Sequence, residues 1–200
     1  MTTDPKLPRD GFKRALIIVG GLLVAMWAVE LVDWLGGHWL ELDRFGIRPR
    51  QTGWLPGILL APFLHAGWAH LAANSIPFLI LGLLVCGRGE GRFWAATAGI
   101  VVLGGLGVWL IGRAGTVHVG ASGLIFGYFG YLVAAGWVER SLAAVVRAVI
   151  VVVLYGSILW GVLPTRAGVS WEGHLCGLLA GIAIAFAWRN RHGRSGDSSP

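Results

Sequence analysis

Six long apolar segments dominate this chain of 200 residues. Each is close to the ~20 residues that an α-helix needs to cross the hydrocarbon core of a bilayer. Charged residues make up only 13% of the chain, which leaves too little charge to coat a surface exposed to water. We therefore expect an all-α membrane protein with a bundle of six transmembrane helices. The expected spans cover residues 15–35, 68–85, 93–111, 119–138, 143–163 and 171–188.

The distribution of lysine and arginine predicts the sidedness of this bundle. Of the 16 basic residues, eleven fall on the side that holds both termini and five on the opposite side. The positive-inside rule then places both termini in the cytoplasm, as an even number of spans also requires. We expect a cytoplasmic arm over residues 1–14, the six-span domain over residues 15–188 and a basic cytoplasmic tail over residues 189–200. Because the basic residues lie between spans and at the termini, we expect no nucleic-acid partner.

Polar side chains recur at one depth of the predicted bundle. The second, fourth and sixth spans run in the same direction, so all three begin near the outer face. The first turns of these spans contain His70 and Asn74, then Ser122, and then His174. Polar and ionisable groups within a membrane normally face the interior of the bundle. We therefore expect these four side chains to meet near the extracytoplasmic surface.

Glycines offer a way to bring two of these spans into contact. His174, Gly177 and Gly181 share one helix face, and the face that follows Ser122 carries a similar row of glycines at 123, 127 and 130. Small residues allow membrane helices to approach backbone to backbone. The imidazole could then take the Ser122 proton during attack on a carbonyl group. The donors for the resulting oxyanion would be the N–H of Ser122 with His70 and Asn74.

These residues resemble the motifs of the rhomboid family of intramembrane serine proteases. Residues 120–123 (Gly-Ala-Ser-Gly) match its G-x-S-G nucleophile motif, residues 70–74 match its H-x-x-x-N motif, and residues 174–181 resemble the histidine motif of its last span. The resemblance covers about residues 54–188. It implies a catalytic dyad of Ser122 and His174. By the same resemblance, the oxyanion and substrate site comprises His70, Asn74, Gly120, Ala121 and Gly123, supported by His65, Phe126, Gly177 and Gly181.

The resemblance also implies an activity, a serine endopeptidase that cleaves transmembrane segments of other membrane proteins without a metal or cofactor. The substrate would enter laterally from the bilayer, past the second and fifth spans, into a site that opens toward the extracytoplasmic side. Residues 164–170 would form a mobile cap. The protein would be a multi-pass protein of the cell membrane, and its oligomeric state is not indicated.

Other interpretations stay open at this point. A non-catalytic binder or chaperone of membrane helices could use the same lateral cleft, and a small transporter could use His70 and His174 as proton relays. Taken alone, Ser122 would be a helix cap. Glu172 lies two residues before His174, on a different helix face, and is a poor third member of a triad. We expect His118 and His38 at exposed interfacial positions.

Overall fold

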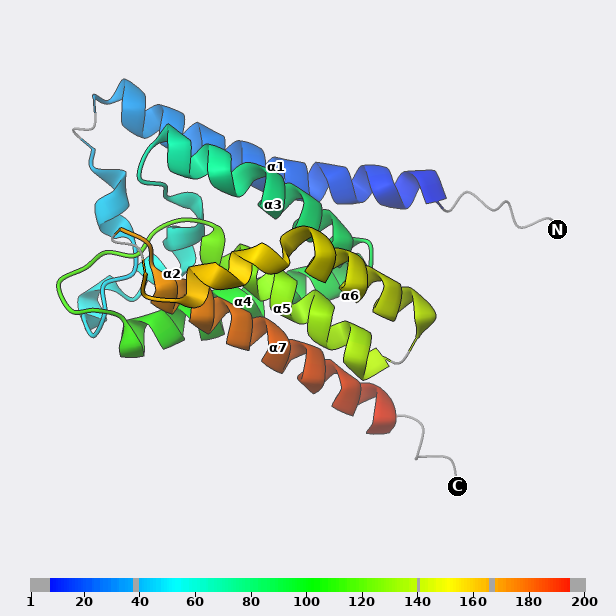
Figure 1. Ribbon diagram of the computed structural model, residues 1–200. Coiled ribbons are helices and arrows are strands. Elements are labelled where there is room, and N and C mark those ends of the chain that lie inside the picture. The colour runs from blue at the N-terminus through cyan, green and yellow to red at the C-terminus, as the bar shows by residue number, and fades with distance from the viewer. Residues whose placement is uncertain (1–7, 38–39, 140, 166–167, 195–200) are drawn as a thin grey trace.

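The computed structural model describes residues 8–37, 40–139, 141–165 and 168–194, and within them every regular element is a helix (Figure 1). The long helices are α1 (Pro8–Leu35), α3 (Trp68–Cys86), α4 (Glu90–Ile111), α5 (Ser122–Glu139), α6 (Leu142–Tyr155) and α7 (Trp171–Arg194). Short helical turns fill the first loop as η1 (Leu42–Phe45), η2 (Thr52–Trp54), α2 (Gly57–Leu60) and η3 (Ala61–Phe63). A 3₁₀ segment, η4 (Gly156–Val162), continues α6.

Among the described residues, five stretches are long and apolar enough to cross a bilayer. They are Gly11–Leu35, Trp68–Cys86, Glu90–Ile111, Leu142–Val162 and Trp171–Trp188. The span expected over residues 119–138 corresponds to α5, which is not among them; its eighteen residues begin with Ser122, end with Glu139 and include four glycines. The all-helical architecture is therefore confirmed, whereas the count of six spans stays a prediction.

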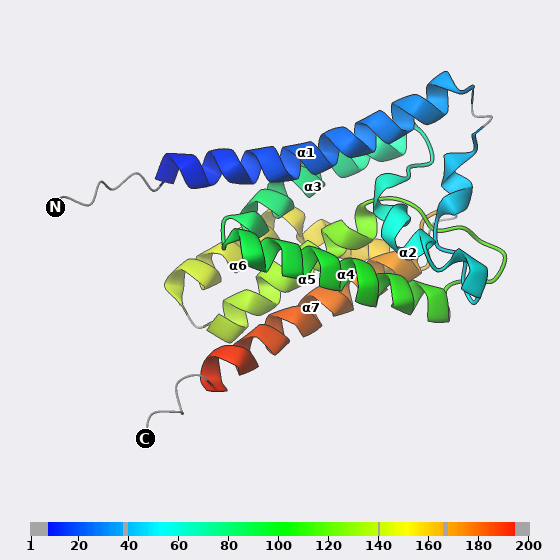
Figure 2. The same cartoon turned by 180° about the vertical axis from the view of Figure 1, so that it is seen from behind.

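α5 is the central helix of the bundle. It packs against α7, α6, α3 and α4, while α1 lies on the outside against α3. Figure 2 shows α4 crossing α5 and α7 from the side opposite to the view of Figure 1. Twelve of the eighteen residues of α5 are buried. The ring of Tyr128 lies between Phe78 and Phe93, with centroid distances of 6.1 and 5.9 Å, and its hydroxyl bonds Thr97 at 2.8 Å. A helix enclosed in this way can position a functional group with little freedom to move.

The outer surface of α6 is apolar. Val149, Val153, Leu154 and Trp160 are all exposed along α6 and η4. In water a continuous apolar surface of this kind promotes association, whereas lipid tails solvate it without cost. α6 therefore has the surface of a helix that faces lipid.

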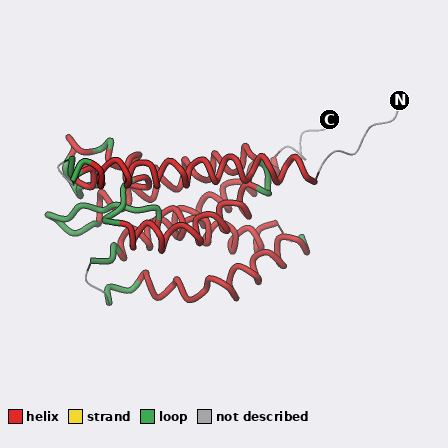
Figure 3. The backbone as a smooth tube through the Cα atoms, turned by 90° about the horizontal axis from the view of Figure 1, so that it is seen from above, coloured by secondary structure: helices red, strands yellow, loops and turns green. Residues whose placement is uncertain are grey.

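The ends of the bundle differ in character. The first turn of α1 and the last turn of α7 lie at the same end, and most of the longer loops gather at the opposite end (Figure 3). α1 begins at Pro8, within the expected arm, and α7 continues through Arg194, within the expected tail. The helices thus extend further than the apolar stretches on which the predicted boundaries were based.

The first loop forms a folded platform at the loop-rich end. Ile47 pairs with His118 through two backbone hydrogen bonds of 2.9 Å. The guanidinium of Arg50 donates to the Leu110 carbonyl at 2.9 Å, and that of Arg48 lies 4.1 Å from the centre of the Trp54 ring. The loop is therefore fixed to the end of α4 and to the connection between α4 and α5.

Candidate active site

Ser122 and His174 meet at the loop-rich ends of α5 and α7. The Ser122 Oγ lies 3.0 Å from the His174 Nε2, and the His174 Nδ1 lies 2.8 Å from the carbonyl oxygen of Gly161 in η4. Because a carbonyl can only accept, Nδ1 carries the imidazole proton and Nε2 is the bare nitrogen. The Ser122 hydroxyl therefore donates to Nε2, as a nucleophile does to its general base.

Glycines make this contact between α5 and α7 possible. A Cβ atom at Gly177 would collide with the carbonyl oxygen of Gly123, and one at Gly181 would collide with that of Gly127. A Cβ at Gly130 would come within 2.6 Å of the Leu178 carbonyl oxygen. The backbone-to-backbone packing that the glycine spacing predicts is thus confirmed.

The His174 ring is also held from the side. The Phe126 ring stacks on it, with centroids 4.1 Å apart and planes 6° from parallel. Phe126 lies one turn after Ser122 on α5, so one helix supplies both the hydroxyl and the surface on which the imidazole rests. Since Gly161 fixes Nδ1 and Phe126 fixes the plane, Nε2 has one available direction, toward Ser122.

His70 and Asn74 lie beside Gly120, just before the start of α5. A Cβ atom at Gly120 would lie 2.8 Å from the His70 Nε2 and 3.5 Å from the Asn74 Nδ2, and Gly120 has a φ of 108°. Only glycine suits both that backbone conformation and that space. Asn74 Nδ2 is buried and has no hydrogen-bond partner among the described residues. Leaving a buried donor without a hydrogen-bond partner costs free energy, unless a ligand accepts a hydrogen bond from it.

His65 fixes the backbone next to the serine. The Ala121 N–H donates to the His65 Nε2 at 3.3 Å, and the His65 ring meets the His70 ring edge-on at 5.2 Å. Burial, reinforced by the neighbouring His70, lowers the pKa of His65 from 6.5 to about 4. His65 is therefore a neutral hydrogen-bond acceptor that anchors the loop before Ser122.

This shift in the pKa of His65 predicts a loss of stability in acid. The folded state binds the proton less well than the unfolded state, so the stabilisation is present above about pH 6.5 and is lost as the pH falls toward 4. Between pH 7.5 and 5 we expect a loss of about 2 kcal/mol, or roughly 4–8 °C in the unfolding temperature. Thermal unfolding in detergent at both pH values measures it. A His65→Gln variant, whose amide oxygen can accept from the Ala121 N–H, should lose less stability between these pH values than the wild-type protein. Equal losses in the two proteins would contradict the assignment of the effect to His65.

A cavity of about 520 Å³ lies against these groups. Its lining includes His70 and Asn74 from α3, Ser122 and Phe126 from α5, and His174 from α7. The structure thus brings all four of the polar residues expected at the outer level to one space. The Ser122 hydroxyl and the His174 imidazole, which contact each other, therefore share this space with the Asn74 amide and the His70 imidazole.

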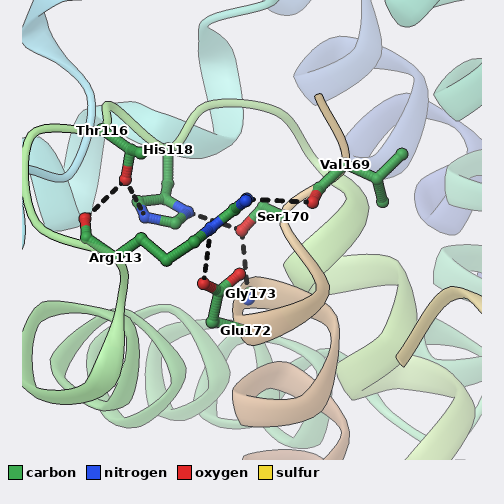
Figure 4. A network of polar contacts seen from close by, with 7 residues as sticks. All are labelled: Arg113, Thr116, His118, Val169, Ser170, Glu172 and Gly173. Atoms are coloured by element: carbon green, nitrogen blue, oxygen red, sulfur yellow. Dashed lines mark hydrogen bonds and ion pairs between the residues drawn. The ribbon is translucent and has the colours of Figure 1, made fainter. Parts of the chain in front are cut away.

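The sequence did not predict the contacts of His118 with Ser170 and Thr116, which lie near the site. The expectation that His118 is exposed is wrong, because it is buried and its two ring nitrogens contact Ser170 and Thr116 (Figure 4). Its burial depends on a partner 52 residues away, which no local pattern indicates. His38 lies outside the described residues.

Glu172 is fully buried, and its carboxylate binds Arg113 at 3.0 Å rather than His174, in keeping with its expected position on a different helix face.

Comparisons with known proteins agree with these motifs. A family model described as "Rhomboid domain" matches residues 52–191. An uncharacterized protein of Mycobacterium tuberculosis strain H37Rv is 45% identical over 199 residues, which cover 92% of this chain and 82% of the relative. "Putative rhomboid protease YdcA" of Bacillus subtilis is 33% identical over 172 residues, covering 80% of this chain and 84% of that protein. "RHOMBOID-like protein 5" of Arabidopsis thaliana is 32% identical over 135 residues, covering 62% of this chain and 41% of that protein.

Proposed function

The chain belongs to the rhomboid family of intramembrane serine proteases, and from this premise we propose that it is an endopeptidase that cleaves transmembrane segments of other membrane proteins. Ser122 is the nucleophile and His174 the general base. The observation that carries the proposal is the 3.0 Å contact between the Ser122 Oγ and the unprotonated Nε2 of His174. The proton on Nδ1, held by Gly161, fixes the tautomer that this role requires.

The reaction follows from the positions of these groups. The Ser122 oxygen attacks the scissile carbonyl carbon while its proton moves to the His174 Nε2. The oxyanion then lies near His70, Asn74 and the first N–H groups of α5, which have no acceptor within their own helix. His174 returns the proton to the leaving amine, which leaves an acyl group on Ser122. A water molecule, deprotonated by the same histidine, releases the second product and restores the serine.

The arrangement of the cavity supports lateral entry of the substrate. The cavity is lined by Asn74 and Pro77 of α3 on one side and by Ile158 of η4 on another. A transmembrane segment that enters between α3 and the α6–η4 unit would therefore reach Ser122 from the lipid. We propose six spans with both termini in the cytoplasm, so that the site lies toward the extracytoplasmic face of the cell membrane. The protein's partners are then its transmembrane substrates and the bilayer.

Labelling with a fluorophosphonate, which reacts with activated serines, tests the proposal directly. We expect the folded wild-type protein in detergent to be labelled, because His174 activates Ser122, and the Ser122→Ala variant to remain unlabelled. Ser75→Ala is a matched control, since the Ser75 hydroxyl on the neighbouring α3 donates to the Leu71 carbonyl at 2.8 Å rather than to a basic nitrogen. Folded wild type without labelling would favour the alternative, a non-catalytic binder of membrane helices.

A further inference from the structure

Two hydrogen bonds join the same two segments of the chain, and each spans 52 residues. One is the 3.0 Å contact between Ser122 and His174, and the other is a 2.6 Å contact between the His118 Nδ1 and the Ser170 Oγ. His118 precedes Ser122 by four residues, and Ser170 precedes His174 by four residues. The His118–Ser170 pair, drawn in Figure 4, is therefore a second link between these segments, and it lies four residues ahead of the dyad on each of them.

The neighbouring contacts fix the direction of this second hydrogen bond. Thr116 Oγ1 donates its one proton to the Arg113 carbonyl at 2.7 Å, so it can only accept from the His118 Nε2, at 2.9 Å. The His118 proton therefore sits on Nε2 and leaves Nδ1 to accept from the Ser170 hydroxyl. Burial lowers the pKa of His118 and keeps the ring neutral. Each proton in this chain of contacts has one defined acceptor.

Both ends of the link are rigidly placed. His118 is held by its backbone pairing with Ile47 in the first loop. Ser170 caps α7, because its Oγ accepts from the Gly173 N–H at 3.1 Å and its carbonyl accepts from the His174 N–H at 3.1 Å. The hydroxyl that caps α7 is thus the same hydroxyl that bonds His118. The first turn of α7 cannot move away from the segment before Ser122 without breaking this link.

We propose that His118 and Ser170 are positioning residues, whose hydrogen bond sets the distance between Ser122 and His174. The inference rests on the proposed function. His174 lies in the turn that Ser170 caps, so a shift of that turn moves Nε2 relative to Ser122. Arg113 adds two more contacts to the start of α7, since its guanidinium binds the buried Glu172 carboxylate at 3.0 Å and donates to the Val169 carbonyl at 3.5 Å. The Arg113 side chain is exposed, and neither contact holds the Ser170 hydroxyl or the His118 ring. A displacement of about 1 Å at reacting atoms can lower a rate by roughly a hundredfold.

The test measures cleavage kinetics of a model transmembrane substrate, per folded molecule. Ser170→Ala and His118→Gln each remove the link, since the glutamine amide reaches the position of Nε2 and not of Nδ1. We expect each to lower kcat by about ten- to a hundredfold with KM nearly unchanged. The double variant should be no slower than the slower single variant, because both changes remove one bond. His118→Asn, whose amide oxygen can take the place of Nδ1, should restore kcat to within a few-fold of wild type.

Ser141→Ala is the matched control for the loss of a helix cap. Ser141 caps α6 by accepting from the Ala144 N–H at 3.2 Å, with no connection to the dyad. It should lower the unfolding temperature without changing kcat. If Ser170→Ala and His118→Gln behave in this same way, the link only stabilises the fold and the inference is overturned. A folded wild type that neither cleaves nor is labelled instead contradicts the proposed function, and the inference falls with it.

Discussion

Cleavage of a transmembrane model substrate is expected to fall by more than about 10⁴-fold when Ser122 or His174 is replaced by alanine. The serine variant lacks the attacking oxygen, and the histidine variant lacks the base that contacts it. The double variant should be no slower than either single variant, because the two groups act as one unit. The effect is measured by reconstituting enzyme and substrate in liposomes and quantifying the cleavage product on a gel.

A loss of fold must be separated from a loss of chemistry in this experiment. Ser122→Ala removes one hydrogen bond at the edge of a cavity, so the unfolding temperature should stay within a few degrees of the wild-type value. Undiminished cleavage by a folded Ser122→Ala protein would remove Ser122 from the mechanism. Undiminished cleavage by His174→Ala would do the same for the base.

The second large effect concerns the glycines between α5 and α7. Gly177→Ala should place a methyl group against the backbone carbonyl of Gly123, and Gly181→Ala should do so at Gly127. Because a backbone atom cannot rotate away, the helices must separate, at a cost of about 1–3 kcal/mol or more. We expect the unfolding temperature to fall by several degrees for both variants. Gly177→Ala should also abolish most of the cleavage, since Gly177 lies one turn from His174.

Gly20→Ala is the control for the glycine variants. Gly20 lies in α1, where a Cβ atom would meet nothing within 4 Å, and alanine favours a helix more than glycine does. This variant should be as stable as the wild-type protein and as active. If Gly177→Ala matched Gly20→Ala in both measurements, α5 and α7 would not be in the close contact described here.

The sequence predicted the contact between α5 and α7 more fully than the bounds of the helices. Helix periodicity places Gly177 and Gly181 on the same face as His174, and this prediction needs no knowledge of the loops. The break of the fifth apolar stretch at Tyr155 was not predicted, because the whole stretch Leu142–Val162 is long and apolar enough to form one span. The burial of His118 was missed because it depends on Ser170 and on Ile47, two contacts made only after the chain has folded.

The end of η4 has a consequence for how the imidazole of His174 is oriented. In a 3₁₀ segment the Gly161 carbonyl would accept from residue 164, but that residue is Pro164, which has no N–H. The next candidate, the Thr165 N–H, donates to Leu163 instead. A proline thus leaves one main-chain oxygen vacant for His174, so the group that orients the base is not a side chain and cannot be removed by truncating one. A Cβ atom at Gly161 would lie 3.0 Å from the His174 Nδ1 and 2.9 Å from the Phe126 ring, so the orientation of the base depends both on a glycine at this position and on where the helix stops.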